Sequence, residues 1–207
     1  MEPTWLAMAK RLQALAETGL QFSSDQYDQE RYQEIASIAL EMMAQLGNVP
    51  IEPIKNLLST GEVGYVTPKV EVRGAIIQDD KILLVQEKED SLWALPGGYA
   101  DVGLSPAENV EKEVLEEAGI PVKAHYLYAV RHKAKGPYPP DVRDFYKLHF
   151  ICHPTDQTPP QPGAETTAAQ YFPFDQLPEL ATAKVLEDDI VAARNFLTSK
   201  RFLTHFD

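Results

Sequence analysis

Three glutamates with helical spacing lie in the middle of the chain. Glu113, Glu116 and Glu117 are spaced i, i+3 and i+4, so a helix would place all three carboxylates on one face. Like charges at this spacing destabilise an isolated helix by roughly a few tenths of a kcal/mol per pair. A divalent cation would offset that repulsion, and carboxylate oxygens suit Mg²⁺ or Mn²⁺. The alternative is a solvated acidic helix face, which is what most charge runs are.

The residues around these glutamates predict a helix with defined ends. Ser105 is a good N-cap, Pro106 suits the first helical position, and Glu108 completes a capping box. Gly119 can adopt the left-handed conformation that ends a helix. An apolar stripe on another face would anchor the helix to a core, and it consists of Val110, Val114 and Ala118.

The same stretch matches a known family pattern, the Nudix box, G-x5-E-x7-R-E-U-x-E-E-x-G-U, in which U is an aliphatic residue. The matching positions are Gly98, Glu113, Glu116, Glu117, Gly119 and Ile120. The chain therefore resembles Nudix hydrolases. Two positions depart from the pattern, because Leu104 stands where the first glutamate belongs and Lys112 replaces the arginine.

The resemblance covers nearly the whole chain. The runs DQYDQERYQEI, YVTPKVEVRGAII and KILLVQEKEDSLWALPGGYADVG are similar to one Nudix subgroup that carries a helical N-terminal domain. That subgroup includes ADP-ribose and CDP-choline pyrophosphatases, and a loop of the ADVG type without the first glutamate is familiar in it. The resemblance implies an α/β fold, namely an α/β/α sandwich with a mixed sheet, preceded by a small helical subdomain.

The resemblance also implies roles for residues of the box. Glu113 and Glu117 would be direct metal ligands, Glu116 would share or bridge, and a carbonyl near Gly97 would add a further ligand. Glycine at that position allows close approach of the backbone. The implied cofactor is Mg²⁺ or Mn²⁺, which would clamp phosphate oxygens and activate water.

A leucine at position 104 cannot accept a proton, so another residue must act as the general base. Glu165 is our candidate, because it lies in a Pro-rich loop that precedes an aromatic strand and a D-x-LP turn, as in the Nudix pattern. Loops on a rigid scaffold often carry catalytic groups. The alternative is a solvent-exposed loop carboxylate.

Four further residues are candidate substrate contacts, each with a structural alternative. Arg73 would contact a phosphate or pair with Glu71, and Trp93 would stack on a base or pack in the core. Lys112 would brace the metal carboxylates less tightly than arginine, since an ammonium cannot form a two-pronged hydrogen bond. Arg131 belongs to a basic neighbourhood that also contains His132, Lys133, Lys135 and Arg143. This neighbourhood would steer an anionic substrate or be an ordinary solvated loop.

Composition restricts the class of partner. A formal net charge of -12 argues against a duplex-DNA-binding surface, but a nucleotide-derived small molecule can be reached through metal ions. Cys152 is the single cysteine, which excludes an intramolecular disulfide and favours a cytoplasmic setting. The N-terminus has neither a signal-peptide pattern nor an apolar run long enough to span a membrane.

Apolar periodicity divides the 207-residue chain into two parts, a helical arm over residues 1–62 and a Nudix domain over 63–207. In the arm we expect a first helix that stops at Gly19, a second that starts at Asp25 or Asp28, and a short third one over 54–58. The arm has apolar stripes but little bulk, which favours a homodimer formed through these helices. In the second part we expect, besides the box helix, strands over 70–77, 81–86, 93–96, 122–134, 145–153 and 169–174 and a closing helix over 185–197.

These observations predict a metal-dependent Nudix pyrophosphohydrolase. It would cleave a nucleoside diphosphate linked to a small moiety, with ADP-ribose preferred to CDP-choline, into a nucleoside monophosphate and a phosphorylated moiety. Two alternatives stay open. Leu104 favours a sensor that binds ADP-ribose-like ligands without hydrolysing them, and the same metal site would also serve an exonuclease acting on RNA ends.

Overall fold

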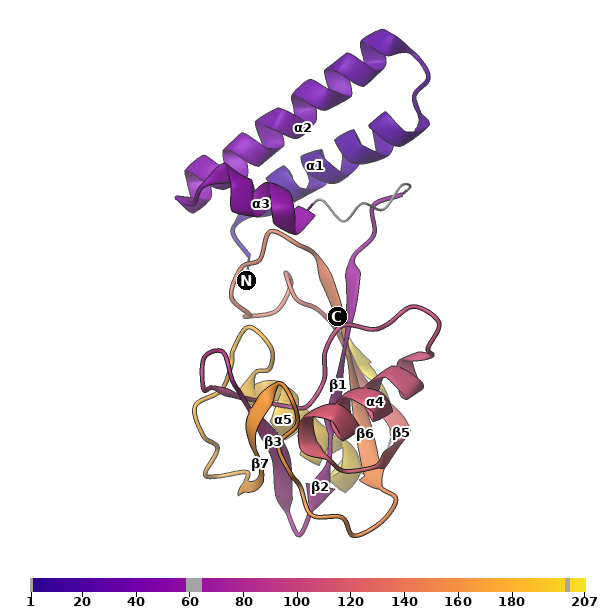
Figure 1. Cartoon of the computed structure of the whole chain (residues 1–207), viewed down its shortest axis with the longest axis vertical. Helices are drawn as coiled ribbons and strands as arrows, with labels where there is room; N and C mark the ends of the chain where they lie inside the picture. Colours follow the sequence, from indigo (N-terminus) through magenta and orange to yellow (C-terminus); the bar gives the residue numbers. More distant parts are fainter. Residues whose placement is uncertain (1, 59–64, 200–201) are drawn as a thin grey trace. The chain divides into compact units, whose positions relative to one another are not determined.

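The chain forms two compact units in the computed structural model, which describes residues 2–58, 65–199 and 202–207 (Figure 1). One unit comprises Met1–Lys69 and Pro139–Asp144, and the other comprises Val70–Tyr138 and Phe145–Asp207. The predicted boundary between residues 62 and 63 lies outside the described residues. Each unit is described below by itself.

The first unit is helical, which confirms the predicted N-terminal subdomain. It consists of α1 (Thr4–Phe22), α2 (Gln26–Gly47) and α3 (Ile51–Leu58). Their small core is formed by Leu6, Ala9, Met43 and Ile54, all at most 4% exposed. Asp25 is the N-cap of α2, where its carboxylate accepts a hydrogen bond from the Asp28 N–H at 3.0 Å.

The predicted end of the first helix at Gly19 is wrong, because α1 continues to Phe22 and is capped at Ser23. Glycine occupies this position for a packing reason. A Cβ on Gly19 would lie 2.4 Å from the ring of Tyr32 on α2, so the missing side chain lets the tyrosine pack against the helix backbone. Close helix packing therefore explains a glycine that the sequence pattern presents as a stop.

The second unit is built on two sheets. The first has the strand order β1-β6-β5-β8, and in the second β3 pairs with β2, β4 and β7. The β5–β8 pairing is parallel, whereas β5 pairs antiparallel with β6 and β3 pairs antiparallel with β2, β4 and β7, which makes the architecture mixed. The strand bounds are Lys69–Ala75 (β1), Ile77–Gln78 (β2), Lys81–Glu87 (β3), Trp93–Ala94 (β4), Val122–His132 (β5), Phe145–Pro154 (β6), Thr166–Pro173 (β7) and His205–Phe206 (β8). The sequence pattern does not predict β8, and β4 and β5 each end two residues before the predicted position.

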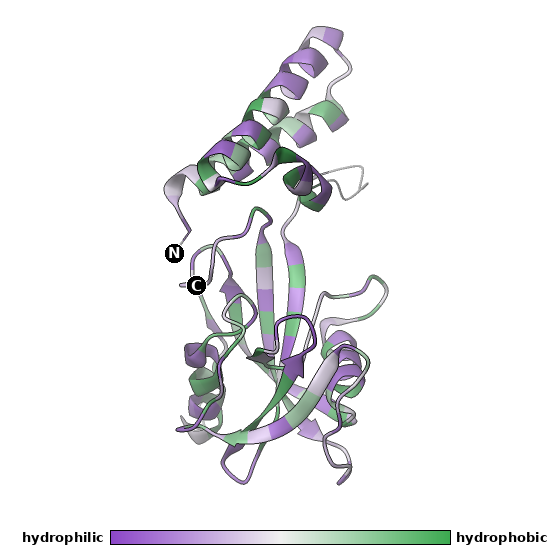
Figure 2. Ribbon diagram, turned by 60° about the vertical axis from the view of Figure 1, so that its left-hand side comes forward, coloured by the Kyte–Doolittle hydropathy of each residue, from purple (hydrophilic) through white to green (hydrophobic). Residues whose placement is uncertain are grey.

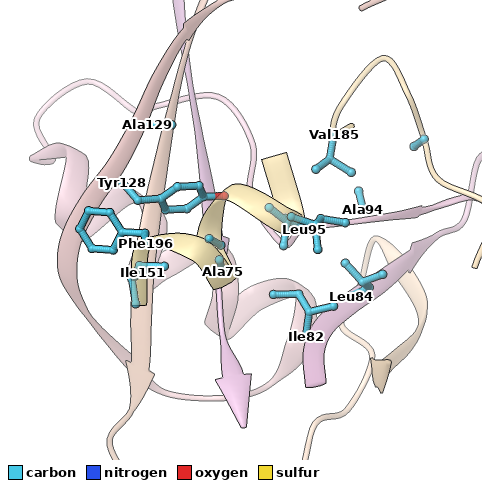
Figure 3. Packing of buried hydrophobic residues seen from close by; sticks show 13 residues of the cluster. Ala75, Ile82, Leu84, Ala94, Leu95, Tyr128, Ala129, Ile151, Val185 and Phe196 are labelled. Carbon is cyan, nitrogen blue, oxygen red and sulfur yellow. The ribbon is translucent and has the colours of Figure 1, made fainter. Parts of the chain in front are cut away.

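Helices α4 (Pro106–Ala118) and α5 (Glu187–Ser199) cover opposite faces of the strands (Figures 1 and 2). Alternation along β3 explains this arrangement. Leu83 and Val85 pack in the cluster that contains the apolar stripe of α4, whereas Ile82 and Leu84 pack in the cluster of α5. Figure 3 shows the cluster that contains Ile82, Leu84 and residues of α5. The predicted α/β/α sandwich is confirmed.

Candidate active site

Helix α4 carries the predicted metal ligands and has the predicted ends. The Ser105 Oγ accepts a hydrogen bond from the Glu108 N–H at 3.2 Å, and the Glu108 carboxylate accepts one from the Ser105 N–H at 2.7 Å. Gly119 ends the helix with a φ of 68°. The capping box and the glycine therefore fix where the helix starts and stops, and with it the positions of its glutamates.

A glycine turn lies directly against two of these glutamates. The Gly97 N–H donates a hydrogen bond of 2.8 Å to the Glu117 Oε2. A Cβ on Gly97 would lie 2.1 Å from the Val72 carbonyl oxygen, and a Cβ on Gly98 would lie 2.9 Å from the Glu113 Oε2. At Gly97 only glycine permits this approach, because a Cβ would meet backbone atoms, whereas at Gly98 it would meet the end of the Glu113 side chain. The pair thus brings backbone groups to the two carboxylates.

Glu113 and Glu117 are charged groups in a partly dry environment. Glu117 is only 6% exposed, and burial raises its pKa to about 7, although Arg73 and the Gly97 N–H oppose the shift. Burial also raises the pKa of Glu113, and the charge of Glu165 adds to that effect. Both groups are therefore costly to ionise without a compensating cation.

Glu116 differs from the other two predicted ligands. Its carboxylate is exposed and forms an ion pair of 3.0 Å with Lys112, which also pairs with Asp101 at 3.1 Å. Lys112 thus pairs directly with Glu116 and with the loop before α4, and its charge also opposes the rise that burial causes in the pKa of the half-buried Glu113. Within residues 2–58, 65–199 and 202–207, no three carboxylate, imidazole or thiol side chains are grouped closely enough to hold an ion as they stand.

A buried network of charges lies behind the glycine turn. The Arg73 guanidinium donates hydrogen bonds to the Glu71 carboxylate and, at 2.9 Å, to the Leu95 carbonyl. The Lys147 ammonium donates to the other Glu71 oxygen at 2.8 Å. Burial alone would raise the pKa of Glu71, but the charges of Arg73 and Lys147 outweigh it and hold that pKa at about 2. Arg73 therefore both pairs with Glu71 and supports the strand that leads into the turn.

Glu87 is a residue of this site that the sequence analysis missed. It lies at the end of β3, is 7% exposed, and its charge contributes to the raised pKa of Glu117. The Lys184 Nζ lies 2.6 Å from its Oε1. An acidic residue that ends an otherwise apolar strand, KILLVQE, is the signal that could have found it.

The loop that carries Glu165 is fixed to the end of α4. The Thr166 hydroxyl donates to the Glu117 carbonyl at 2.7 Å, and the Gly163 N–H donates to that hydroxyl at 2.8 Å. A Cβ on Gly163 would lie 1.6 Å from the Glu116 carbonyl oxygen, so the backbones touch here. These contacts explain why an exposed loop carboxylate acts electrostatically on Glu113.

Two predicted substrate contacts have structural partners elsewhere. Trp93 packs edge-on against Phe172 with ring centroids 4.7 Å apart, as its core-packing alternative predicts. The Arg131 guanidinium lies 3.7 Å from Asp189 and 3.6 Å from Asp207. The predicted basic neighbourhood is divided, because Arg143 belongs to the helical unit and the other four residues belong to the second unit.

Together, the sandwich fold and the acidic helix held against a glycine turn define a class of α/β enzymes with a carboxylate-lined centre. The chain belongs to the Nudix family, since the NUDIX domain model matches residues 68–193. A second model, described as "UDP-X-like, N-terminal oligomerisation domain", matches residues 3–58. The predicted enzyme class, a Nudix pyrophosphohydrolase, is confirmed.

Three relatives match this chain over different shares of its length. The chain is 42% identical over 207 residues to a "Putative ADP-ribose pyrophosphatase" of Bacillus subtilis, and the match covers 100% of this chain and 99% of the relative. A solved UDP-X diphosphatase is 32% identical, with a TM-score of 0.64, and the match covers 98% of both chains. An ADP-ribose pyrophosphatase from Streptococcus suis is 37% identical, with a TM-score of 0.60, and the match covers 68% of this chain and 100% of that one.

No helix in the described part of the chain is long and apolar enough to cross a membrane.

Proposed function

We propose that this Nudix enzyme is a divalent-metal-dependent pyrophosphohydrolase that acts on a nucleoside diphosphate linked to a small moiety. ADP-ribose is the preferred candidate. The observation that carries the proposal is the placement of Glu113 and Glu117 beside the Gly97–Gly98 turn, buried enough that ionisation of both calls for a cation.

The donor set of the site suits Mg²⁺ or Mn²⁺. Glu113 and Glu117 would supply carboxylate oxygens and Gly97 a carbonyl, all hard ligands for these ions. Glu116 would contribute only by leaving its ion pair with Lys112. A bound ion would supply charge neutralisation on the diphosphate and a bound water of lowered pKa.

The chain's own residues would provide the remaining functions. Glu165 would accept the proton of the attacking water, a role supported by its electrostatic effect on Glu113 and by the anchoring of its loop to α4. Arg73 would hold the turn in place through its bond to the Leu95 carbonyl. Lys112 would fix the loop before α4 through Asp101.

The substrate class follows from the relatives. The Bacillus subtilis and Streptococcus suis proteins are described as ADP-ribose pyrophosphatases, and the structure that covers 98% of this chain is a UDP-X diphosphatase. These descriptions support a nucleoside diphosphate linked to a second group. Among candidate substrates we rank ADP-ribose first. CDP-choline remains a candidate from the sequence resemblance, and the UDP-X diphosphatase adds uridine diphosphate conjugates as further candidates.

A substrate panel tests the proposal. Purified protein is incubated with ADP-ribose, CDP-choline and a UDP-sugar under Mg²⁺, Mn²⁺ or a chelator, and the nucleoside monophosphate is quantified. We expect release from at least one compound, loss with the chelator and recovery on adding metal. Glu117→Gln should lose metal-dependent activity, while Glu179→Gln, an exposed carboxylate outside the site, should not. Absence of release from every compound would reject the enzyme assignment.

One observation favours a second candidate, a non-hydrolysing sensor of ADP-ribose-like ligands. Leu104, at the position of the first box glutamate, is 39% exposed and brings no carboxylate to the loop. Calorimetry distinguishes the two functions, because a sensor would bind ADP-ribose tightly in the presence of Mg²⁺ and release no nucleotide over hours.

A further inference from the structure

Glu87 and Lys184 form a charge pair beside the proposed catalytic carboxylates. Glu87 ends β3 at a point where the β3–β7 register shifts, between Gln86 and Glu87. Such bulges re-aim side chains and are common next to active sites. The result is a carboxylate that is 7% exposed and close enough to Glu117 and Arg73 to act on both electrostatically.

Three cations, Arg73, Lys147 and Lys184, form ion pairs with Glu71 or Glu87, and they differ in their exposure to solvent. The side chains of Arg73 and Lys147 are 3% and 0% exposed, and both are bonded to Glu71. The side chain of Lys184 is 38% exposed, and its Nζ lies 2.6 Å from the Glu87 Oε1. Of these three cations, Lys184 is therefore the one that a ligand in solution can contact.

The backbone of Lys184 is held in place by the same network. Its carbonyl accepts a hydrogen bond of 2.8 Å from the buried Lys147 ammonium, and its N–H donates one of 2.7 Å to the Ala181 carbonyl. The contact with Glu87 is an ion pair without a hydrogen bond, because the buried Glu87 Oε1 accepts none. A lysine with a fixed backbone and a fixed counter-ion can direct its three ammonium donors to an anion.

We propose that Lys184 binds a phosphate of the diphosphate substrate and that Glu87 is the positioning residue that holds Lys184 for this contact. The inference rests on the proposed function, since a diphosphate bound beside Glu113 and Glu117 would bring phosphate oxygens to this side of the site. It adds a direct protein cation to a site otherwise dominated by carboxylates. The proposal also explains how the buried Glu87 can lie next to a site that binds an anionic diphosphate, because Lys184 compensates the charge of Glu87.

Kinetics on variants of the full chain test the assignment. With ADP-ribose and Mg²⁺, Lys184→Met should raise KM by about 10-fold or more, the scale of one lost charge-assisted hydrogen bond, and change kcat by less than about 2-fold. Lys184→Arg should restore most of the affinity. Calorimetry with inorganic pyrophosphate and Mg²⁺ should show the same loss of affinity for Lys184→Met.

The chain offers a matched control pair. Lys123 lies 2.6 Å from Glu111, the same separation as in the Lys184–Glu87 pair, but on the solvent-exposed side of α4 and β5. Lys123→Met should leave KM and pyrophosphate affinity unchanged. Glu87→Gln should raise KM in the wild-type background and have little further effect in Lys184→Met, because it acts through Lys184.

The outcomes separate this inference from the proposed function. If wild type hydrolyses ADP-ribose and Lys184→Met keeps its KM, or only melts at a lower temperature, the inference is overturned and the function stands. If wild type hydrolyses nothing, the pyrophosphate titration still decides, because an unchanged affinity in Lys184→Met rejects the contact. Wild type that binds neither compound would overturn both.

Discussion

At the scale of single residues, the surroundings of each glutamate decide its chemistry. Glu113 and Glu117 are raised in pKa by burial, whereas Glu116 on the same helix is neutralised by Lys112 in solvent. A cation bound at the turn would therefore interact most strongly with the buried Glu117 and the half-buried Glu113, since their charge is poorly solvated. Three glutamates of one helix thus have unequal roles.

Glu165 is the residue on which turnover should depend most directly. Glu165→Gln keeps the shape of the side chain but removes proton acceptance, so kcat should fall by about 10²-fold, the usual scale for loss of a general base. The measurement is nucleotide release at saturating metal. Glu179→Gln provides the matched control on an exposed loop. An unchanged kcat would remove Glu165 from the mechanism.

His149 should make stability depend on pH. Burial lowers its pKa from 6.5 to about 4, against the attraction of Asp189 and with help from the charge of Lys147. Between these values the unfolded chain binds more protons than the folded one, so stability falls as pH falls from 6.5 towards 4. The shift corresponds to at most about 3 kcal/mol.

Denaturant titrations at several pH values measure this dependence. In His149→Gln, the contribution of His149 to the slope of stability against pH should disappear between pH 6.5 and 4. The loss of stability that protonation of carboxylates causes in acid should remain. Comparing slopes rather than absolute stabilities removes the cost of the substitution itself. Equal slopes in the two proteins would show that folding does not shift the pKa of His149.

At the scale of elements, the site is a contact between a helix and two loops. The capping box and Gly119 set the ends of α4. The Gly97–Gly98 turn packs against its carboxylates, and the start of β7 is bonded to the Glu117 carbonyl, in the last turn of α4, through the Thr166 hydroxyl. Since each of these contacts uses backbone atoms, the size of a new side chain, rather than its charge, limits substitution at the glycines of these loops.

Two glycines test this element directly. Gly97 has a φ of 148° and a Cβ there would overlap the Val72 carbonyl, so Gly97→Ala should destabilise the fold by about 2–4 kcal/mol and displace the N–H from Glu117. Gly103 also has a positive φ, 92°, but nothing in the described part of the chain lies within 4 Å of where a Cβ would stand. Gly103→Ala should therefore cost only about 1 kcal/mol, the backbone contribution alone. Chemical denaturation compares the two, and equal losses would contradict the packing argument.

At the scale of the whole molecule, the helical unit carries exposed apolar side chains. Met8, Leu15, Phe22 and Ile38 are between 48% and 68% exposed, and Figure 2 shows hydrophobic segments recurring along α1 and α2. Contiguous exposed apolar surface is typical of protein–protein interfaces, and we expect these helices to form one. The match of residues 3–58 to an N-terminal oligomerisation domain supports the proposed homodimer.

Charge placed on this surface should separate the subunits. Met8 and Leu15 lie two helical turns apart on α1, so Met8→Glu with Leu15→Glu adds two like charges to the same face. Sedimentation of the full chain should show a dimer, and the double variant should sediment as a monomer with helical content retained by circular dichroism. A wild-type monomer, or a variant that remains a dimer, would contradict the interface on α1.

The residues needed to recognise the box helix are local in sequence. Ser105, Glu108 and Gly119 fix a helix through bonds between near neighbours, and the spacing of Glu113 and Glu117 then follows from helical geometry. For this reason the acidic helix could be predicted from the sequence, and the fold class followed from the family resemblance that this helix and the flanking runs carry.

Other features depend on which distant segments meet. Gly19 resembles a helix stop in the sequence because the ring of Tyr32 that fills its place lies on another helix. Strand β8 escapes prediction because its two residues are defined only by pairing with β5. The partners of Arg131, at Asp189 and Asp207, come from α5 and the end of the chain.

The sequence by itself determined the helix, its caps, its glutamates and the glycine turn before it. Only the tertiary structure decided that Glu87 and Lys184 join the site and that Thr166 fixes the Glu165 loop to α4. The physical reason is the range of the interactions. Helical hydrogen bonds join residues a few positions apart, whereas a buried charge takes whichever partner the packing of strands and loops brings within a few ångströms.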